Sequence, residues 1–246
     1  MMKKLFNWIF TVSFLLTFGL ILCIFHPIQM IARAIGYGPH KKVVDIMCWF
    51  ILYVCIPSTL SSLRLKNLAG KLPTDRPLLI ISNHQSSFDI PMISVLLHKH
   101  HPKYVSKKSL SKGIPSISYN IREGGYAIID RKKPEEALEI IRNFGAYMEK
   151  HCRSGCIFPE GTRAKDGVMK PFKLKGVLQL LEATPNALVV PVAIENSWKL
   201  ERWNLLPVST FIRFRCTALP ALEPKDFEPT QLIEEVEKRI RTHIGQ

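Results

Sequence analysis

The residues that most directly indicate chemistry are His84 and Asp89, five positions apart in the stretch Asn83–Asp89. An imidazole can accept and return a proton near neutral pH. The apolar run Leu78–Ile81 just before the pair predicts a buried strand, and α/β proteins carry their sites at the carboxyl ends of strands. A turn into a helix would bring the carboxylate onto one imidazole nitrogen and leave the other free as a base. Alternatively, Asp89 could cap the turn by accepting backbone N–H groups.

Two further predicted strand ends carry charged side chains. Gly125–Ile129 is apolar and leads into Asp130 and Arg131, and Phe158–Arg163 combines a strand end, a glycine turn and an arginine. Arginine suits a phosphate because its planar fork can bond two phosphate oxygens. For Arg131 a surface ion pair with a neighbouring carboxylate is an equally simple interpretation.

These three stretches, followed by Val190–Ile194, resemble the glycerolipid acyltransferase family from about residue 77 to residue 198, most nearly the bacterial 1-acyl-sn-glycerol-3-phosphate acyltransferases. The resemblance implies transfer of an acyl chain from acyl-CoA or acyl-carrier protein to the sn-2 hydroxyl of 1-acyl-sn-glycerol-3-phosphate, giving phosphatidic acid. It implies two substrates, a lysophospholipid and an acyl thioester, and neither a cofactor nor a metal. The sequence departs from the family pattern at Ser118, where a glycine is usual, and by one extra residue within Pro171–Gly176.

The resemblance also assigns roles. We expect direct attack without an acyl-enzyme, in which His84 removes the hydroxyl proton and later protonates the thiolate, while Asp89 orients the imidazole. Backbone N–H groups around Gly161 are expected to bind the oxyanion.

The phosphate of the acceptor needs fixed positive charge, for which Arg163 and Arg131 are the leading candidates and Lys107 a third. The substrate-binding set also includes Glu160, Gly161 and Thr162. Glu160 could order Arg163, touch the glycerol or simply cap the turn.

Composition narrows the class of partner. The chain has 246 residues, with 34 Lys+Arg against 20 Asp+Glu, a net charge of +14. That surplus favours a polyanionic partner. Because the first quarter of the chain is strongly apolar, we expect anionic lipid or a phosphorylated substrate and no nucleic acid. Six cysteines include Cys152 and Cys156, but no second pair completes a zinc site, so no metal is expected.

The N-terminal region contains two apolar runs. Leu5–Phe25 would form a helix of roughly 31 Å, long enough to span a bilayer, whereas Val43–Pro57 would reach only about 22 Å. A cleaved signal peptide is disfavoured, because the first run is too long and no cleavage site follows. Every flank is basic, through Lys3, Lys4, Arg33, Lys41, Lys42, Arg64, Lys66 and Lys71. The positive-inside rule therefore favours a re-entrant hairpin on the cytoplasmic face of a bacterial inner membrane, the alternative being one ordinary transmembrane anchor.

The remaining pattern alternates strand and helix, which predicts an α/β fold: a single mixed-sheet acyltransferase domain at 64–246 carried by an N-terminal apolar helical hairpin at 1–63. Strands are expected at 77–82, 103–106, 127–130, 156–158 and 187–194, with an edge strand at 211–216. Helices are expected after residue 82 and at 134–150, 175–183 and 230–243.

Two alternative functions stay open. One is an acyltransferase acting on another lysolipid, such as a lyso-ornithine lipid or lysocardiolipin. The other is a non-catalytic basic membrane protein that binds anionic lipid or nucleic acid. No glycine-rich nucleotide loop and no Gly-x-Ser-x-Gly motif is present in the sequence.

Overall fold

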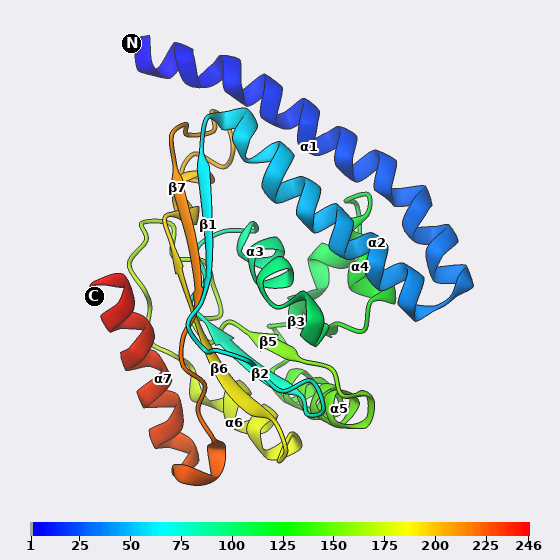
Figure 1. Ribbon diagram of the computed structural model, residues 1–246, viewed down its shortest axis with the longest axis vertical. Helices are drawn as coiled ribbons and strands as arrows, with labels where there is room; N and C mark the ends of the chain where they lie inside the picture. Colours follow the sequence, from blue (N-terminus) through cyan, green and yellow to red (C-terminus); the bar gives the residue numbers. More distant parts are fainter. Residues whose placement is uncertain (1) are drawn as a thin grey trace.

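The chain opens with a helical hairpin (Figure 1). The computed structural model describes residues 2–246, with side chains from Phe6 onward, so the side chains of Lys3 and Lys4 lie outside the described part. Helix α1 (Met2–Ile35) turns back through one residue into α2 (Tyr37–Phe50). The second helix continues through a π-helical turn, η1 (Ile51–Cys55), and a 3-10 turn, η2 (Pro57–Thr59).

The second helix is longer than predicted. It runs without a break over Tyr37–Thr59, 23 residues, so the expectation of a helix of about 15 residues was wrong. The added N-terminal turns are polar and contain His40, Lys41 and Lys42, which is why the apolar run alone did not reveal them. By length and composition alone, both Phe6–Ile35 and Tyr37–Thr59 could cross a membrane.

The hairpin has two different faces. One face is buried in the same core as the rest of the molecule, through Phe14, Ile21, Met47 and Leu52. The outer face exposes large apolar side chains along its whole length, namely Trp8, Ile9, Val12, Leu16, Leu20, Ile24, Ile31 and Ile35 on α1 and Trp49, Tyr53 and Val54 on the second helix. The hairpin is therefore part of the folded body on one side and offers an apolar surface on the other.

A seven-stranded sheet in the order β1-β7-β6-β2-β5-β3-β4 organises the rest of the chain. All neighbouring strands are parallel except β6 and β7, so the predicted mixed α/β sheet is confirmed. The strands are β1 (Ser62–Asn67), β2 (Leu78–Ser82), β3 (Lys103–Lys107), β4 (Ala127–Ile129), β5 (Gly155–Ile157), β6 (Leu188–Glu195) and β7 (Arg213–Ala218).

The edge of the sheet differs from the prediction. The strand predicted at 211–216 is β7, and it lies inside the sheet because β1 pairs along its outer side, Ser62 opposite Arg213. Strand β1 was not predicted, since its residues are mostly exposed and polar. It also begins before residue 64, so the sheet takes residues from both sides of the predicted boundary.

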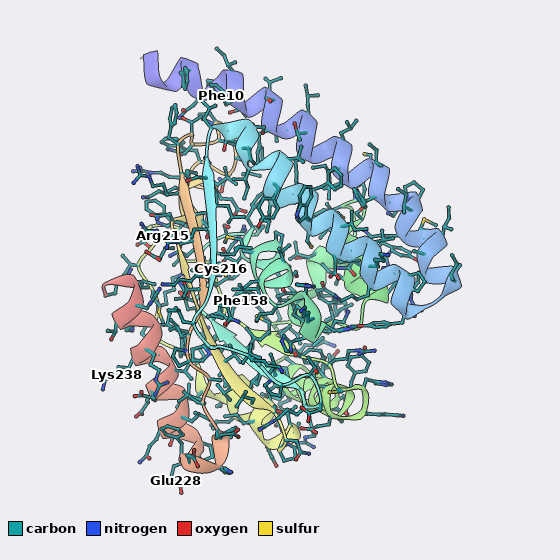
Figure 2. All side chains as sticks on the ribbon, viewed as in Figure 1. Phe10, Phe158, Arg215, Cys216, Glu228 and Lys238 are labelled. Carbon is teal, nitrogen blue, oxygen red and sulfur yellow. The ribbon has the colours of Figure 1, made fainter. Side chains whose placement is uncertain are left out.

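Helices cover both faces of the sheet (Figure 1). The hairpin and α3 pack on one face, while α5, α6 and α7 pack on the other. Alternate residues of β2 point to the two cores, Leu78 and Ile80 to the first and Leu79 and Ile81 to the second, as the period of a strand requires. Figure 2 shows the same alternation on β7, with Arg215 and Cys216 on opposite sides. The α-helices after the hairpin are α3 (Asp89–Leu96), α4 (Ile117–Glu123), α5 (Pro134–His151), α6 (Leu174–Ala183) and α7 (Pro229–Ile244).

Candidate active site

The histidine and the aspartate meet where β2 leads into α3. The Nδ1 atom of His84 lies 2.8 Å from Oδ2 of Asp89, and the Asp89 side chain is completely buried. The imidazole also stacks on the ring of Phe158 at the end of β5, with the ring centroids 4.1 Å apart. Contacts on one nitrogen and on one ring face fix the orientation of the imidazole and leave Nε2 as the nitrogen available to a substrate.

Asp89 also caps the turn, so both interpretations of this residue hold together. Its Oδ2 accepts the backbone N–H groups of Gln85 at 2.6 Å and Ser86 at 2.9 Å. Its Oδ1 accepts the hydroxyls of Ser86 at 3.2 Å and Ser197 at 2.6 Å. A buried carboxylate is tolerated only where donors replace its lost hydration, and these four bonds together with His84 do so.

Glu160 is buried and links two backbone segments. It is 2 % exposed, and its two carboxylate oxygens accept the backbone N–H of His84 at 2.7 Å and that of Lys170 at 2.9 Å. Burial raises the pKa of Glu160, and the two backbone bonds counter part of that rise. Of the three roles foreseen for Glu160, the structure shows the one nearest to capping, because the carboxylate fixes the backbone under His84.

Gly161 forms the turn after β5. Its φ of 69° lies in the left-handed region that favours glycine. Its N–H donates to the carbonyl oxygen of Phe158 at 3.0 Å. The N–H of Gly161 therefore closes the turn, and the binding of an oxyanion by other backbone N–H groups around Gly161 stays a prediction.

A cavity of about 940 Å³ opens beside the histidine. Its walls are mainly apolar and come from the hairpin, α3, α4 and the segment between β3 and α4, including Phe18, Met47, Ile51, Phe88, Ile90, Leu110, Ile114, Ile117 and Ile121. A long, mostly apolar ligand with a polar end fits such a space. Because α1 and the second helix supply part of the wall, the cavity exists only when the hairpin is docked.

Positive charge collects around the polar end of this cavity. The lining includes five cations and one carboxylate, namely Lys107, Arg131, Arg163, Lys165, Lys170 and Asp166. Partial burial and, to a smaller extent, repulsion from the guanidinium of Arg163 lower the pKa of Arg131. Like charges held this close favour the binding of an anion.

The predicted substrate-binding residues differ in their placement. Four of the six line the cavity beside His84, namely Lys107, Arg131, Thr162 and Arg163. The hydroxyl of Thr162 accepts a hydrogen bond from Nζ of Lys170 at 2.8 Å. The remaining two, the buried glutamate and the turn glycine described above, support the loop from behind.

Arg163 already has partners in this structure. Its Nη1 donates to the hydroxyl of Ser87 at 2.9 Å and forms an ion pair with the carboxylate of Glu201. The same carboxylate accepts the backbone N–H of Ser87 at 2.8 Å.

Sequence reasoning missed four residues of the site, namely Lys165, Lys170, Ser197 and Glu201, and it expected Ser87 to serve only the start of the helix. Ser197 and Glu201 follow β6, which pairs with β2, so the rule that parallel strand ends meet at one edge was the available signal. No local pattern distinguished them from ordinary loop residues.

Comparisons with known proteins agree with this geometry. A family model described as Acyltransferase matches residues 66–195. The 1-acyl-sn-glycerol-3-phosphate acyltransferase of Saccharomyces cerevisiae is 27% identical over 193 residues, 73% of this chain and 62% of that protein. The enzyme of the same name from Helicobacter pylori is 29% identical over 171 residues, 66% of each chain. This chain thus spans slightly less than two thirds of the length of these two relatives.

Among solved structures, the 1-acyl-sn-glycerophosphate (LPA) acyltransferase PlsC from Thermotoga maritima shares the fold. The superposition has a TM-score of 0.77 with 21% sequence identity and covers 98% of this chain and 95% of that one. The likeness therefore includes the N-terminal hairpin as well as the sheet. Because the matched family model covers more than half of the chain and contains both the His84–Asp89 stretch and the strand end at Phe158–Arg163, this chain belongs to the acyltransferase family.

Proposed function

We propose that the protein transfers an acyl chain from an acyl thioester to the sn-2 hydroxyl of 1-acyl-sn-glycerol-3-phosphate, giving phosphatidic acid. The observation that carries this proposal is a histidine hydrogen-bonded to a buried carboxylate, His84 to Asp89, at the polar end of an apolar cavity with a cationic rim. The apolar space suits acyl chains and the cations suit a phosphate. The names of the relatives support the same reaction.

In the proposed mechanism, Nε2 of His84 removes the proton from the glycerol hydroxyl as its oxygen attacks the thioester carbonyl. Asp89 accepts the Nδ1 proton in a hydrogen bond and stabilises the imidazolium that forms. When the tetrahedral intermediate collapses, the imidazolium returns the proton to the leaving thiolate. No covalent acyl-enzyme is required, and we assign no nucleophilic side chain.

For the acceptor we propose that its phosphate binds Arg163, with Arg131 and Lys107 adding charge from the same rim. This placement puts the headgroup at the mouth and the acyl chains against the apolar walls. A lyso-ornithine lipid or lysocardiolipin would use the same walls but would gain less from a cationic rim built for a phosphomonoester. The rival idea of a non-catalytic basic membrane protein gives no role to the histidine and aspartate.

We also propose that the hairpin lies in the interface of the cytoplasmic leaflet. Its outer apolar face is continuous and has no partner among the described residues. Its tip touches the catalytic body, by which we mean the sheet and the helices that follow the hairpin. There the hydroxyl oxygen of Tyr37 lies 2.9 Å from Nδ1 of His101, and Nε of Arg33 lies 3.7 Å from Oε2 of Glu123. Tip and body are therefore on one side of the bilayer. The lysolipid would then reach the cavity directly from the leaflet.

The decisive experiment is a matrix of acceptors and donors on the purified full chain, with thiol release as the readout. Acceptors are lysophosphatidate, a lyso-ornithine lipid and lysocardiolipin, and donors are acyl-CoA and acyl-carrier protein. We expect release that depends on lysophosphatidate with at least one donor. A folded His84→Ala protein should lose about 10²–10⁴ in rate. Near-normal turnover by that variant, or acylation of another lysolipid only, would contradict the proposal.

A further inference from the structure

The carboxylate of Glu201 occupies a set of donors at the mouth of the cavity. Its Oε1 accepts the backbone N–H of Ser87 at 2.8 Å, and its Oε2 pairs with Nη1 of Arg163. The same Nη1 donates to the hydroxyl of Ser87 at 2.9 Å. The Glu201 side chain is 13% exposed, against 41% for Arg163, so the carboxylate is the more enclosed partner.

These donors are the ones that a phosphate requires. A guanidinium, a backbone N–H beside a helix start and a hydroxyl all bind phosphate oxygens as readily as carboxylate oxygens. Ser87 and Arg163 both line the cavity next to His84, whereas Glu201 reaches them from the segment after β6. The carboxylate is thus an anion already bound where the acceptor's anion is expected.

We propose that Glu201 stands in for the acceptor phosphate in the resting enzyme and is displaced from Arg163 and Ser87 when the acceptor binds. The inference rests on the proposed function, because it names how the acceptor is recognised at that same site. It makes Glu201 a specificity-determining residue rather than a catalytic one.

The surrounding charges decide which anions can displace the carboxylate. Lys107, Arg131, Lys165 and Lys170 line the same cavity as the arginine that Glu201 holds. A phosphomonoester carries close to two negative charges at neutral pH and gains more from these cations than a single carboxylate does. A phosphodiester or a zwitterionic headgroup brings no such advantage. The stand-in therefore selects lysolipids with a terminal phosphate.

The test compares Glu201→Gln with Glu195→Gln. Glu195 is a matched control, because it lies on the same stretch of chain but pairs with Arg215 at 3.3 Å and not with Arg163. Two quantities are measured on the full chain, the KM for lysophosphatidate and the inhibition constant of inorganic phosphate. We expect Glu201→Gln to lower both by about two- to fivefold, the range for an exposed ion pair, and Glu195→Gln to change neither.

The alternative role for Glu201 is to hold Arg163 in place while the phosphate binds elsewhere on the guanidinium. Glu201→Gln would then raise both constants, which overturns the proposal, as would no change in either. The effect must also depend on the arginine: in an Arg163→Ala background, Glu201→Gln should no longer alter phosphate inhibition. Thermal unfolding of each variant excludes a folding defect as the cause.

Calorimetric binding of inorganic phosphate separates this inference from the proposed reaction, since it needs no turnover. Tighter phosphate binding by Glu201→Gln than by the unaltered protein supports the stand-in even where no lysophosphatidate is acylated, an outcome that would refute only the proposed function. Acylation of lysophosphatidate with equal phosphate binding by both proteins would refute the stand-in alone.

Discussion

At the scale of single residues, the buried carboxylate of Asp89 bonds both the backbone of a turn and the imidazole that we propose as the base. It accepts two backbone N–H groups that shape the start of α3, and it also holds Nδ1 of His84. Ser197, which is completely buried and lies in a distant segment of the chain, donates a further hydrogen bond to the Asp89 carboxylate. The orientation of the imidazole therefore depends on the folding of the whole turn and not only on the pair.

We predict that Ser197→Ala weakens this support. The variant removes one donor from a fully buried carboxylate, which costs about 1–3 kcal/mol. Thermal unfolding should show a lower Tm, and kcat should fall while the KM for lysophosphatidate changes little. Ser197→Thr keeps a hydroxyl and serves as the control. An unchanged Tm and kcat for Ser197→Ala would mean that Asp89 does not need this donor.

We predict that Arg163→Ala mainly weakens binding of the acceptor. A hydrogen bond to a charged group contributes about 1.5–3 kcal/mol. Because the Arg163 side chain is exposed, we expect the lower end of this range, which corresponds to an increase of about tenfold in the KM for lysophosphatidate. The KM for the thioester should change little. Arg142→Ala, an exposed arginine on α5 that does not line the cavity, is the control. A loss confined to the donor's KM would refute the assignment.

At the scale of elements, the sequence predicts what is periodic and misses what depends on pairing. The apolar strands around β2 and β6 and the amphipathic α5 and α7 were all foreseen, because burial leaves a direct pattern in the sequence. Strand β1 has no such pattern and exists because β7 accepts it as a neighbour. The same reason hid Ser197 and Glu201, which the β2–β6 pairing brings to His84 from more than a hundred residues away.

A buried lysine at the start of β3 gives a prediction about pH. Burial, with repulsion from Arg153 and Lys41 in addition, lowers the pKa of Lys103 to about 8. Unfolding restores the ordinary value, so below about pH 8 the folded state bears the penalty of a buried ammonium, and the penalty disappears as the pH rises toward the unfolded value. The penalty is on the order of 3 kcal/mol at pH 7, offset in part by the contact of Nζ with the Tyr37 ring, 5.0 Å from its centroid.

We therefore expect Lys103→Met to raise the Tm by several degrees at pH 7 and by much less at pH 10. Differential scanning calorimetry of both proteins across that range measures the effect, and the difference between them cancels the titrating groups that Lys103 does not influence. The control is Lys175→Met, an exposed lysine on α6. An equal increment at both pH values would show that Lys103 does not titrate in this window.

The cavity gives a second prediction at this scale. Ile117 on α4 is half-buried and lines the apolar wall, so Ile117→Trp should fill part of the space. We expect the preferred acyl chain to become shorter, read as kcat/KM over a series of chain lengths. Ile140→Trp on α5 is the control, because that half-buried residue packs in the opposite core. Equal losses at every chain length would mean that the wall near Ile117 does not contact the acyl chain.

At the scale of the whole molecule, the hairpin and the catalytic body form one structure. Buried residues of both, such as Phe14 and Phe88 with ring centroids 5.7 Å apart, belong to a single core. The apolar pattern predicted the two helices but not this docking. The reason is that the polar turns at the start of α2 pack on the body rather than facing lipid, as in the bond from Nζ of Lys41 to the carbonyl oxygen of His98.

This docking leads to a prediction of topology. Because the tip of the hairpin contacts the body through Tyr37 and Arg33, a cysteine at Gly38 and one at Lys66 should be on the same side of the membrane. In cells that express the protein without Cys23 and Cys152, an impermeant thiol reagent should label neither Gly38→Cys nor Lys66→Cys until the membrane is permeabilised, after which both should react. Both positions are exposed and lie outside the apolar face of the hairpin, so access from one side of the membrane decides the result. Labelling of Gly38→Cys alone in intact cells would require the first helix to span the bilayer, which is incompatible with a docked tip, and would refute the interfacial hairpin while leaving the proposed acyl transfer untouched.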